Sequence, residues 1–106
     1  MVNRGEIWLV NLDPTVSSEI PKTCTCVIVS PAELHDNLRT VIVAPMTSNG
    51  FAAPFRVPVT YGGTKGLILL DKVRTVNKMR LVKKTGAVTA KTLTATLTTL
   101  QEVFAE

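Results

Sequence analysis

The chain has 106 residues, of which 45% are hydrophobic and 19% are charged, and its formal net charge is +4. This composition is typical of a folded globular protein and excludes an intrinsically disordered chain. At this length we expect one domain over residues 1–106, with a core that is thin for its surface, so that dimerisation would help to cover apolar area.

No stretch of the sequence suggests a membrane anchor or an export signal. The longest apolar runs, such as CVIV and GLILL, are far shorter than the about 20 residues that a membrane-spanning helix needs. The opening residues, MVNRGEIW, lack the apolar segment of a signal peptide. The two cysteines are too few for a disulfide framework. We therefore expect a cytoplasmic protein in a reducing environment.

The basic residues are concentrated in one part of the chain. Half of the twelve lysines and arginines fall within residues 72–84, and Asp71 is the one acid beside them. A surface of this kind would attract a polyanion such as a nucleic acid. It would equally serve as a charged sheet edge that resists aggregation. The charge alone does not decide between these two interpretations.

The first half of the chain predicts three strands and one short helical turn. Residues 6–12 and 24–30 are rich in β-branched and apolar side chains, and a long loop with two prolines and two serines separates them. Ser30 and Glu33 flank Pro31 in the pattern of a capping box, which predicts a helical turn. Residues 40–46 (TVIVAPM) are apolar enough for a strand that is buried on both faces.

The second half of the chain predicts further short strands. Residues 55–59 (FRVPV) indicate an edge strand because of their proline. Residues 61–66 (YGGTKG) indicate a turn. Residues 66–76 indicate one long strand or two strands joined by a bend. A second bend is expected at residues 77–81, followed by a short strand at residues 86–88.

The chain is expected to end in a helix. Thr89 can cap this helix, and one of its faces would carry Leu93, Leu97, Leu100 and Phe104. Many short strands followed by one helix predict a mainly β fold. We expect a curved antiparallel sheet that forms a small SH3-like barrel, with the short helical turn after the second strand and the C-terminal helix packed on the sheet.

Cys24 and Cys26 raise the question of a disulfide, a metal site or a nucleophile. On a strand their Cα atoms would lie about 6.5 to 7 Å apart, at or beyond the limit for an unstrained disulfide. A zinc site needs four ligands and a nucleophile needs a base, and His35 is the one further candidate for either role. We therefore expect no metal, and we interpret the cysteines as small side chains on a strand face. His35 is expected to be a solvated loop residue.

The remaining residues predict no enzyme by themselves. The carboxylates are scattered, without the spacing of a metal site or a glycosidase. The segment YGGTKG lacks the spacing of a phosphate-binding P-loop. The residues alone therefore indicate a small basic β domain that binds an anion.

Four segments in combination resemble a known family. They are RGEIWLVNLDPTVSSE at 4–19, CVIVSPAEL at 26–34, TVIVAPMTS at 40–48 and GLILLDKVRTVNKMRL at 66–81. Together they are similar to the MazF/PemK (Kid) family of toxins from type II toxin–antitoxin systems, over essentially the whole chain. The motifs R-G-E-I-W-L-V-x-L-D-P-T and L-D-x-V-R-T-V are specific as a pair, although either alone would be weak.

This resemblance implies a CcdB-like curved sheet, a homodimer, and metal-independent cleavage of single-stranded RNA, often mRNA at a short sequence. In the implied reaction the ribose 2′-OH attacks the adjacent phosphate and leaves a 2′,3′-cyclic phosphate and a 5′-OH. Such a reaction needs a base, an acid, and positive charge or donors around the phosphorane. The resemblance also implies a MazE-like antitoxin with an acidic, partly disordered tail that blocks the RNA groove, and it implies no cofactor.

The resemblance also assigns roles to individual positions. Thr47 matches the catalytic threonine of the family, although it could equally cap its own backbone at a strand end. Asp71 matches a carboxylate implicated in some members, although it could pair with Lys72 or Arg74. Glu19 matches a loop residue that orients a catalytic cation or holds the loop. The RNA path implied by the resemblance runs past Lys22, Ser48, Arg74, Lys78 and Arg80.

The principal catalytic arginine of the family is replaced in this chain. The family pattern K-T-R-P-x-V-x-V-S-P reads K-T-C-T-C-V-I-V-S-P here, so Cys24 and Thr25 stand where the family has Arg and Pro. Some members use instead a His in the first loop and an Arg two residues before the Asp, but Ser18 and Leu69 hold those positions. A neutral thiol cannot stabilise a phosphorane as a guanidinium can, and losing such a donor costs roughly 10² to 10³ in rate.

Two explanations of this replacement stay open. Lys22 or a basic residue of the 72–84 segment could substitute for the arginine, or the chain could bind RNA or antitoxin and cut poorly. The sequence therefore favours an impaired endoribonuclease toxin. The alternatives are a non-catalytic RNA- or antitoxin-binding homologue and a gyrase-inhibiting toxin of the related CcdB type.

Overall fold

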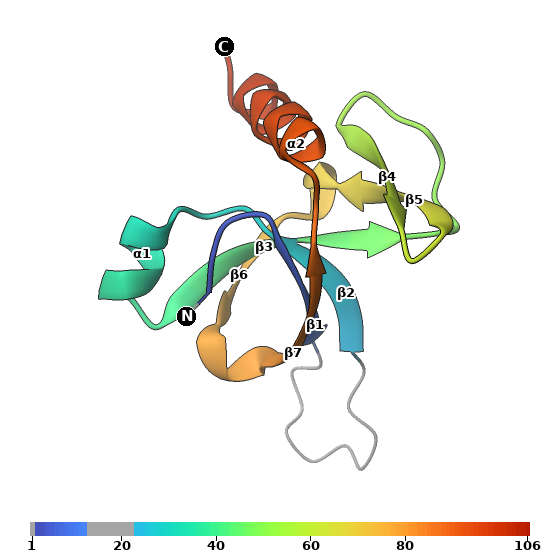
Figure 1. Ribbon diagram of the computed structural model, residues 1–106. Helices are drawn as coiled ribbons and strands as arrows, with labels where there is room; N and C mark the ends of the chain where they lie inside the picture. The colour runs from blue at the N-terminus through green and yellow to red at the C-terminus, as the bar shows by residue number, and fades with distance from the viewer. Residues whose placement is uncertain (1, 13–22) are drawn as a thin grey trace.

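A computed structural model of the protein describes residues 2–12 and 23–106 (Figure 1). Within these residues the chain forms seven strands, two α-helices and two 3₁₀ turns. The first loop, with the predicted site residues Glu19 and Lys22, lies outside the described residues. The elements, in chain order, are β1 (Glu6–Asn11), β2 (Thr23–Ile28), α1 (Ala32–Asn37), β3 (Thr40–Thr47), β4 (Arg56–Tyr61), β5 (Thr64–Leu69), η1 (Leu70–Lys72), β6 (Arg74–Asn77), η2 (Lys78–Arg80), β7 (Leu81–Ala87) and α2 (Ala90–Val103).

The strands form one curled antiparallel sheet in the order β4-β5-β3-β2-β1-β7. The long strand β3 is shared between two parts of the sheet. Its first half, Thr40–Val43, pairs with β6, whereas Met46 and Thr47 at its end pair with β5. Register shifts in the β1–β7 pair mark bulges, which bend the sheet. The result is a half-barrel with the β4–β5 hairpin beside it and α2 next to that hairpin (Figure 1). The predicted fold is therefore confirmed.

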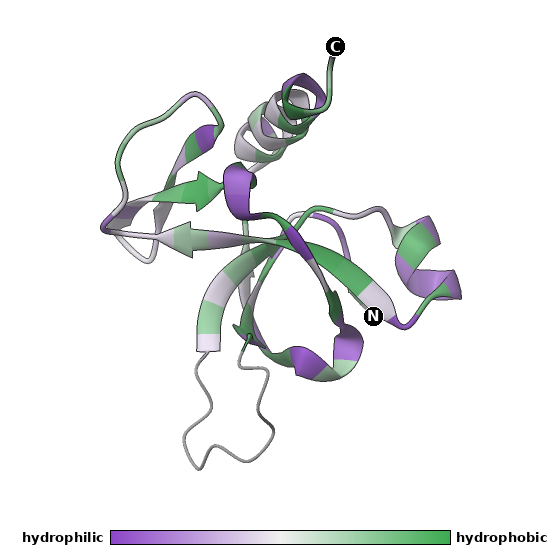
Figure 2. Cartoon of the chain, turned by 180° about the vertical axis from the view of Figure 1, so that it is seen from behind, coloured by the Kyte–Doolittle hydropathy of each residue, from purple (hydrophilic) through white to green (hydrophobic). Residues whose placement is uncertain are grey.

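Two apolar clusters lie on opposite faces of β2 and β3. One contains Val27 and Ala44 and extends to β4, β5 and, through Leu100, to α2. The other contains Ile28 and Val43 and fills the curl of the sheet towards β6. Strand β3 contributes to both clusters, so the prediction of a strand buried on both faces is correct. Figure 2 shows the hydrophobic residues gathered along the middle strands, with hydrophilic residues at α1, η1 and η2.

The β4–β5 hairpin follows the predicted turn. Tyr61 pairs with Thr64, so Gly62 and Gly63 form a two-residue loop, and both have positive φ angles of 59° and 79°. A loop of this type requires left-handed backbone at both positions, which glycine adopts without strain. Pro58 lies on β4 at the outer edge of the sheet, as predicted.

Several details differ from the expectations. The second of the two alternatives for residues 66–76 is right, because η1 separates β5 from β6. The last strand spans Leu81–Ala87 and not only residues 86–88. Helix α2 is capped by the Thr89 hydroxyl, as predicted, but Phe104 is 75% exposed because it lies beyond the last helical residue. Thr96 is the buried residue of the helix, and its hydroxyl donates a hydrogen bond to the carbonyl of Thr92.

The capping box before α1 is not formed. The N-cap residue is Pro31 and has no side-chain capping hydrogen bond. The hydroxyl of Ser30 is instead buried, where it accepts from the amide of Ile42 at 2.9 Å and contacts the ring of His35. The Ser30 hydroxyl therefore bonds to buried partners and does not cap the start of α1. No helix among the described residues is long and apolar enough to cross a membrane.

Candidate functional site

A cleft of about 210 Å³ opens where the start of β2, the end of β3 and the β4–β5 hairpin meet. Its lining combines apolar side chains, several hydroxyl groups and one lysine. The lining residues are Thr25, Met46, Thr47, Ser48, Val59, Tyr61, Thr64, Lys65 and Gly66. The predicted residues Thr47 and Ser48 therefore lie together in this cleft. Tyr61 and Lys65, which the sequence analysis assigned to a turn, line it as well.

The position of Thr47 depends on two glycines. A Cβ atom on Gly66 would lie 2.7 Å from the carbonyl oxygen of Thr47, and one on Gly50 would lie 2.8 Å from its Cγ2. Both distances are too short for any larger residue without displacement of the strand end. The Thr47 hydroxyl accepts from the amide of Asn49 at 3.2 Å, so the local capping role is real. That bond uses an oxygen lone pair and leaves the hydroxyl proton available for a ligand.

Cys24 lies at the exposed start of β2, opposite Val10 of β1. The β2–β3 register pairs Cys26 with Pro45. The β2–β3 pairing ends there, and Cys24 does not line the cleft, whereas its neighbour Thr25 does. The position that the resemblance gives to an arginine therefore lies on a strand that borders the cleft, next to a residue that lines it.

Cys26 lies two residues after Cys24, on the same face of β2, and it is fully buried. Burial raises the pKa of its thiol to about 12, with a smaller contribution from Cys24, while the positive charge of Arg74 acts in the opposite direction. Cys26 is therefore a neutral core residue, as predicted, and both cysteines are free. The effect of Arg74 on this thiol agrees with its place on β6, opposite Val43 and on the same face.

Asp71 does not pair with Lys72 or Arg74, as the sequence analysis had considered. Its two carboxylate oxygens accept from Nε and Nη2 of Arg56, both at 3.2 Å. These hydrogen bonds hold the pKa of the Asp71 carboxyl below its ordinary value, so it stays ionised. The bidentate pair joins the start of β4 to η1. Asp71 is thus engaged with a neighbouring cation, and the Nη1 of that arginine lies on the Gly50 side, towards Thr47.

Two of the predicted RNA-binding cations also have protein partners. The ammonium of Lys78 donates to the carbonyl of His35 in α1. The guanidinium of Arg80 donates to the carbonyl of Asn11 in β1 at 3.2 Å. Both residues belong to η2, and both contacts fasten this turn to other elements.

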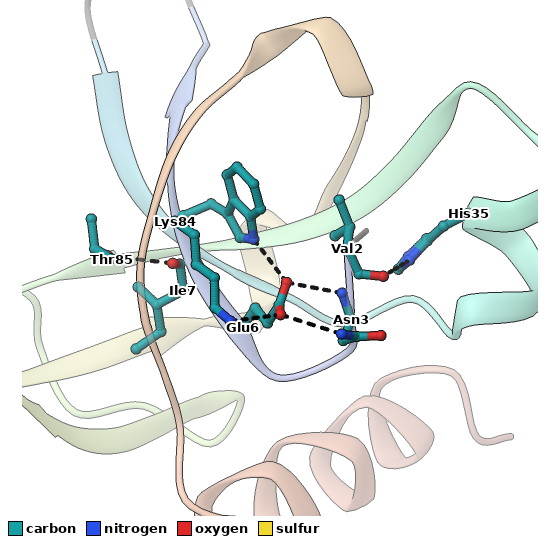
Figure 3. Close-up of polar contacts among 8 residues, drawn as sticks. Val2, Asn3, Glu6, Ile7, His35, Lys84 and Thr85 are labelled. Carbon is teal, nitrogen blue, oxygen red and sulfur yellow. Dashed lines mark hydrogen bonds and ion pairs between the residues drawn. The ribbon is translucent and has the colours of Figure 1, made fainter.

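Glu6 is a buried carboxylate that the sequence did not single out (Figure 3). Its Oε1 accepts from the amide of Asn3 and from Nε1 of Trp8, and its Oε2 lies 3.0 Å from Nζ of Lys84. Burial alone would raise the pKa of Glu6, but these donors outweigh that effect and hold the pKa at about 2. Glu6 is therefore an ionised structural residue. Strand alternation was the available signal, because it places Glu6 and Trp8 on one face.

His35 is also buried and not solvated, which corrects the prediction. Its side chain lies between two partners, the carbonyl of Val2 at Nδ1, 3.1 Å away, and the hydroxyl of Ser30 at Nε2. A carbonyl can only accept, so Nδ1 carries the proton and Nε2 accepts from Ser30 in the neutral ring. Both residues are 2% exposed, so this pair cannot touch an RNA. No group of three His, Cys, Asp or Glu side chains suited to a metal ion occurs among the described residues.

Comparison with solved structures identifies the class of fold. The chain matches an endoribonuclease in complex with its cognate antitoxin from Mycobacterial species with a TM-score of 0.81 and 20% identity, over 96% of this chain and 93% of that one. It also matches MazF from Deinococcus radiodurans with a TM-score of 0.79 and 21% identity, over 96% and 94% of the two chains. The architecture is therefore that of the MazF toxins.

Sequence comparison identifies the family. The profile of the PemK-like, MazF-like toxin of type II toxin–antitoxin system matches residues 3–104. The Escherichia coli endoribonuclease PemK is 40% identical over 81 residues, which are 72% of this chain and 61%, less than two thirds, of that protein. Endoribonuclease MazF9 of Mycobacterium tuberculosis (strain ATCC 25618 / H37Rv) is 32% identical over 101 residues, which cover 85% of each chain. The chain belongs to the PemK-like, MazF-like toxins of type II toxin–antitoxin systems.

Proposed function

We propose that this chain is a metal-independent, sequence-selective endoribonuclease toxin that cuts single-stranded RNA in the cytoplasm, and that its cleavage is impaired. The observation that carries the proposal is the cleft lined by Thr47 and Ser48, with Cys24 on the bordering strand next to the lining residue Thr25. The naming of relatives as endoribonucleases supports the reaction class.

In the proposed reaction the ribose 2′-oxygen forms a bond to phosphorus while the bond from phosphorus to the 5′-oxygen breaks. The 2′-OH loses one proton and the leaving 5′-oxygen gains one, so the products are a 2′,3′-cyclic phosphate and a 5′-OH. Thr47 and Ser48 are suited to donate hydrogen bonds to the non-bridging oxygens, which gain charge in the transition state. Cys24 offers a neutral thiol where a guanidinium would stabilise that charge, which is why we expect slow cleavage.

Asp71 contributes through its ion pair in this proposal. Its contact with Arg56 fixes the β4–β5 hairpin, whose residues line the cleft. Arg74, Lys78 and Arg80 extend the positive charge along the face that an RNA backbone would follow. Glu19 and Lys22 would act from the first loop.

We further propose a homodimer that is neutralised by a MazE-like antitoxin with an acidic tail. Solved structures of similar fold include MazE-MazF complexes from Deinococcus radiodurans, which supports an antitoxin as the partner. The basic segment at residues 72–84 is of the right charge to attract such a tail.

The test measures cleavage of a mixed-sequence single-stranded RNA in the presence of EDTA. It compares the purified parent protein with the Cys24→Arg variant and with the double variant Cys24→Arg/Thr25→Pro. Restoring the guanidinium should raise the cleavage rate roughly 10²-fold to 10³-fold. Thr94→Arg is the matched control, because it adds the same charge at an exposed position of α2 that does not line the cleft. Fragments should carry 5′-OH ends that a kinase labels without phosphatase treatment.

Equal rates for the Cys24→Arg and Thr94→Arg proteins would refute the assignment of position 24. Salt-dependent RNA binding without cleavage by any variant would instead favour the non-catalytic binding homologue.

A further inference from the structure

Lys65 of β5 lines the same cleft as Thr47 and Ser48, and neither charge nor spacing in the sequence singled it out. We infer that Lys65 supplies the positive charge at the RNA phosphate that the missing arginine at position 24 no longer provides. This inference rests on the proposed function, because it concerns the phosphate that the cleft would hold.

Strand pairing assigns Lys65 to the face that carries Thr47. Thr47 pairs with Leu67 in the β3–β5 ladder, and both side chains approach Gly50 from the same side of the sheet. Lys65 lies two residues before Leu67, so alternation assigns its side chain to that face too. Such diagonal neighbours have Cα atoms about 7 to 8 Å apart, which a long side chain can span. The ammonium of Lys65 can therefore reach a phosphate bound at the Thr47 hydroxyl.

The backbone of Lys65 is held on both sides. It pairs with Thr60 of β4, next to the two-residue turn of the hairpin. Gly66, the following residue, approaches the carbonyl of Thr47 so closely that no Cβ would fit. The attachment point of the lysine is therefore fixed relative to Thr47, and only its side chain has to adjust to a ligand.

The other described cations are less suitable for this role. Five of them have protein acceptors, namely Arg4, Arg56, Lys78, Arg80 and Lys84. Arg74 lies on the same face, but its partner Val43 is four residues from Thr47 along β3, which corresponds to about 13 Å. The side chain of Lys65 makes no hydrogen bond or ion pair with the described residues, and Lys65 is the cation among them that lines the cleft.

The inferred role is electrostatic and moves no proton. As the 2′-oxygen attacks and the 5′-oxygen leaves, negative charge grows on the non-bridging oxygens, and a nearby ammonium stabilises it. An ammonium is a point charge without the two-point contact of a guanidinium. Lys65 would therefore sustain cleavage at a lower rate than an arginine at position 24 would.

The test measures single-turnover cleavage of a mixed-sequence RNA by the Lys65→Met and Lys65→Arg variants. The control is Lys91→Met, which removes an exposed lysine from α2. We expect Lys65→Met to lower the rate roughly 10-fold to 10²-fold, while Lys65→Arg and Lys91→Met keep it. In the Cys24→Arg background the loss from Lys65→Met should shrink to within about threefold, because both cations serve one phosphate.

A second measurement separates this inference from the proposed function. Affinity for a non-cleavable 2′-deoxy oligonucleotide is measured against salt concentration, and Lys65→Met should make the slope about 0.7 shallower, as for one lost phosphate contact. If the parent protein and Cys24→Arg both fail to cut RNA, the proposed function fails, and this slope decides whether Lys65 contacts a phosphate. An unchanged slope, or unchanged cleavage by Lys65→Met where the parent protein cuts, overturns the inference.

Discussion

The carboxylate of Glu6 and the ammonium of Lys84 lie 3.0 Å apart across the β1–β7 pair, although only 8% of the Glu6 side chain is exposed. Asn3 and Trp8 complete the donors around this carboxylate. The cluster joins the N-terminal segment to the last strand, so it bears on the stability of the whole sheet.

Stability should fall in acid through this carboxylate. The pKa of Glu6 is lowered from 4.5 to about 2, so its contribution is fully present above pH 4.5 and is lost as pH falls from 4.5 towards 2. The shift corresponds to an upper limit of about 3 kcal/mol. Urea unfolding at a series of pH values should show that Glu6→Gln is less stable by about 2 to 3 kcal/mol at pH 7 and has a flatter acid dependence.

Glu102→Gln is the matched control for that measurement, since Glu102 is exposed on α2. It should change the free energy of unfolding by less than about 0.5 kcal/mol. An acid dependence that is the same in Glu6→Gln and in the parent protein would show that other carboxylates dominate.

Gly66→Ala should damage both stability and the cleft. The added methyl group would meet the Thr47 carbonyl, so the end of β3 must move, at a cost of about 1 to 3 kcal/mol. Gly86→Ala is the control, because its Cβ would reach only the Tyr61 ring at 3.4 Å. Unfolding and RNA cleavage should be measured for both proteins. Equal tolerance of the two alanines would contradict the close approach at Gly66.

Arg56→Met and Asp71→Asn test the role of the ion pair. If Asp71 acts by fixing the hairpin, both substitutions should lower RNA cleavage to a similar extent, and the double variant should lose no more. The pair is partly exposed, so a double-mutant cycle of unfolding free energies should give a coupling of only about 0.5 to 1 kcal/mol. Loss of cleavage in Asp71→Asn alone would identify Asp71 as a group that contacts the substrate.

Ser30→Ala should be destabilising although it removes a single oxygen atom. It leaves the amide of Ile42 and the ring of His35 without their buried partner, at a cost of about 1 to 3 kcal/mol for each. Ser48→Ala, at the exposed position directly after β3, should cost less than about 0.5 kcal/mol. Chemical denaturation measures both, and similar midpoints would rule out the buried role of Ser30.

The strands and the final helix could be predicted because their signals are local. TVIVAPM carries apolar residues at consecutive positions, and this pattern indicates burial on both faces wherever the strand lies. Thr89 caps α2 through a bond three residues away. The resemblance added Thr47 and Ser48, which share one cleft.

The errors concern partners that are distant in the sequence. His35 is buried, and the carbonyl of Val2, 33 residues earlier, accepts a hydrogen bond from its ring. Asp71 pairs with Arg56 across the hairpin, whereas the sequence offered two nearer cations. Lys65 was assigned to a turn, whereas it lies on β5 and lines the cleft. Such relationships depend on how the sheet closes, which no short motif encodes.

Strand β3 makes the two halves of the sheet energetically inseparable. Trp8 packs against the cluster inside the curl, whereas Leu100 brings α2 against the other cluster, and β3 supplies residues to both. Neither half can lose its core while the other keeps an intact β3. Heating should therefore produce one cooperative transition, with the same midpoint by tryptophan fluorescence and by helical circular dichroism.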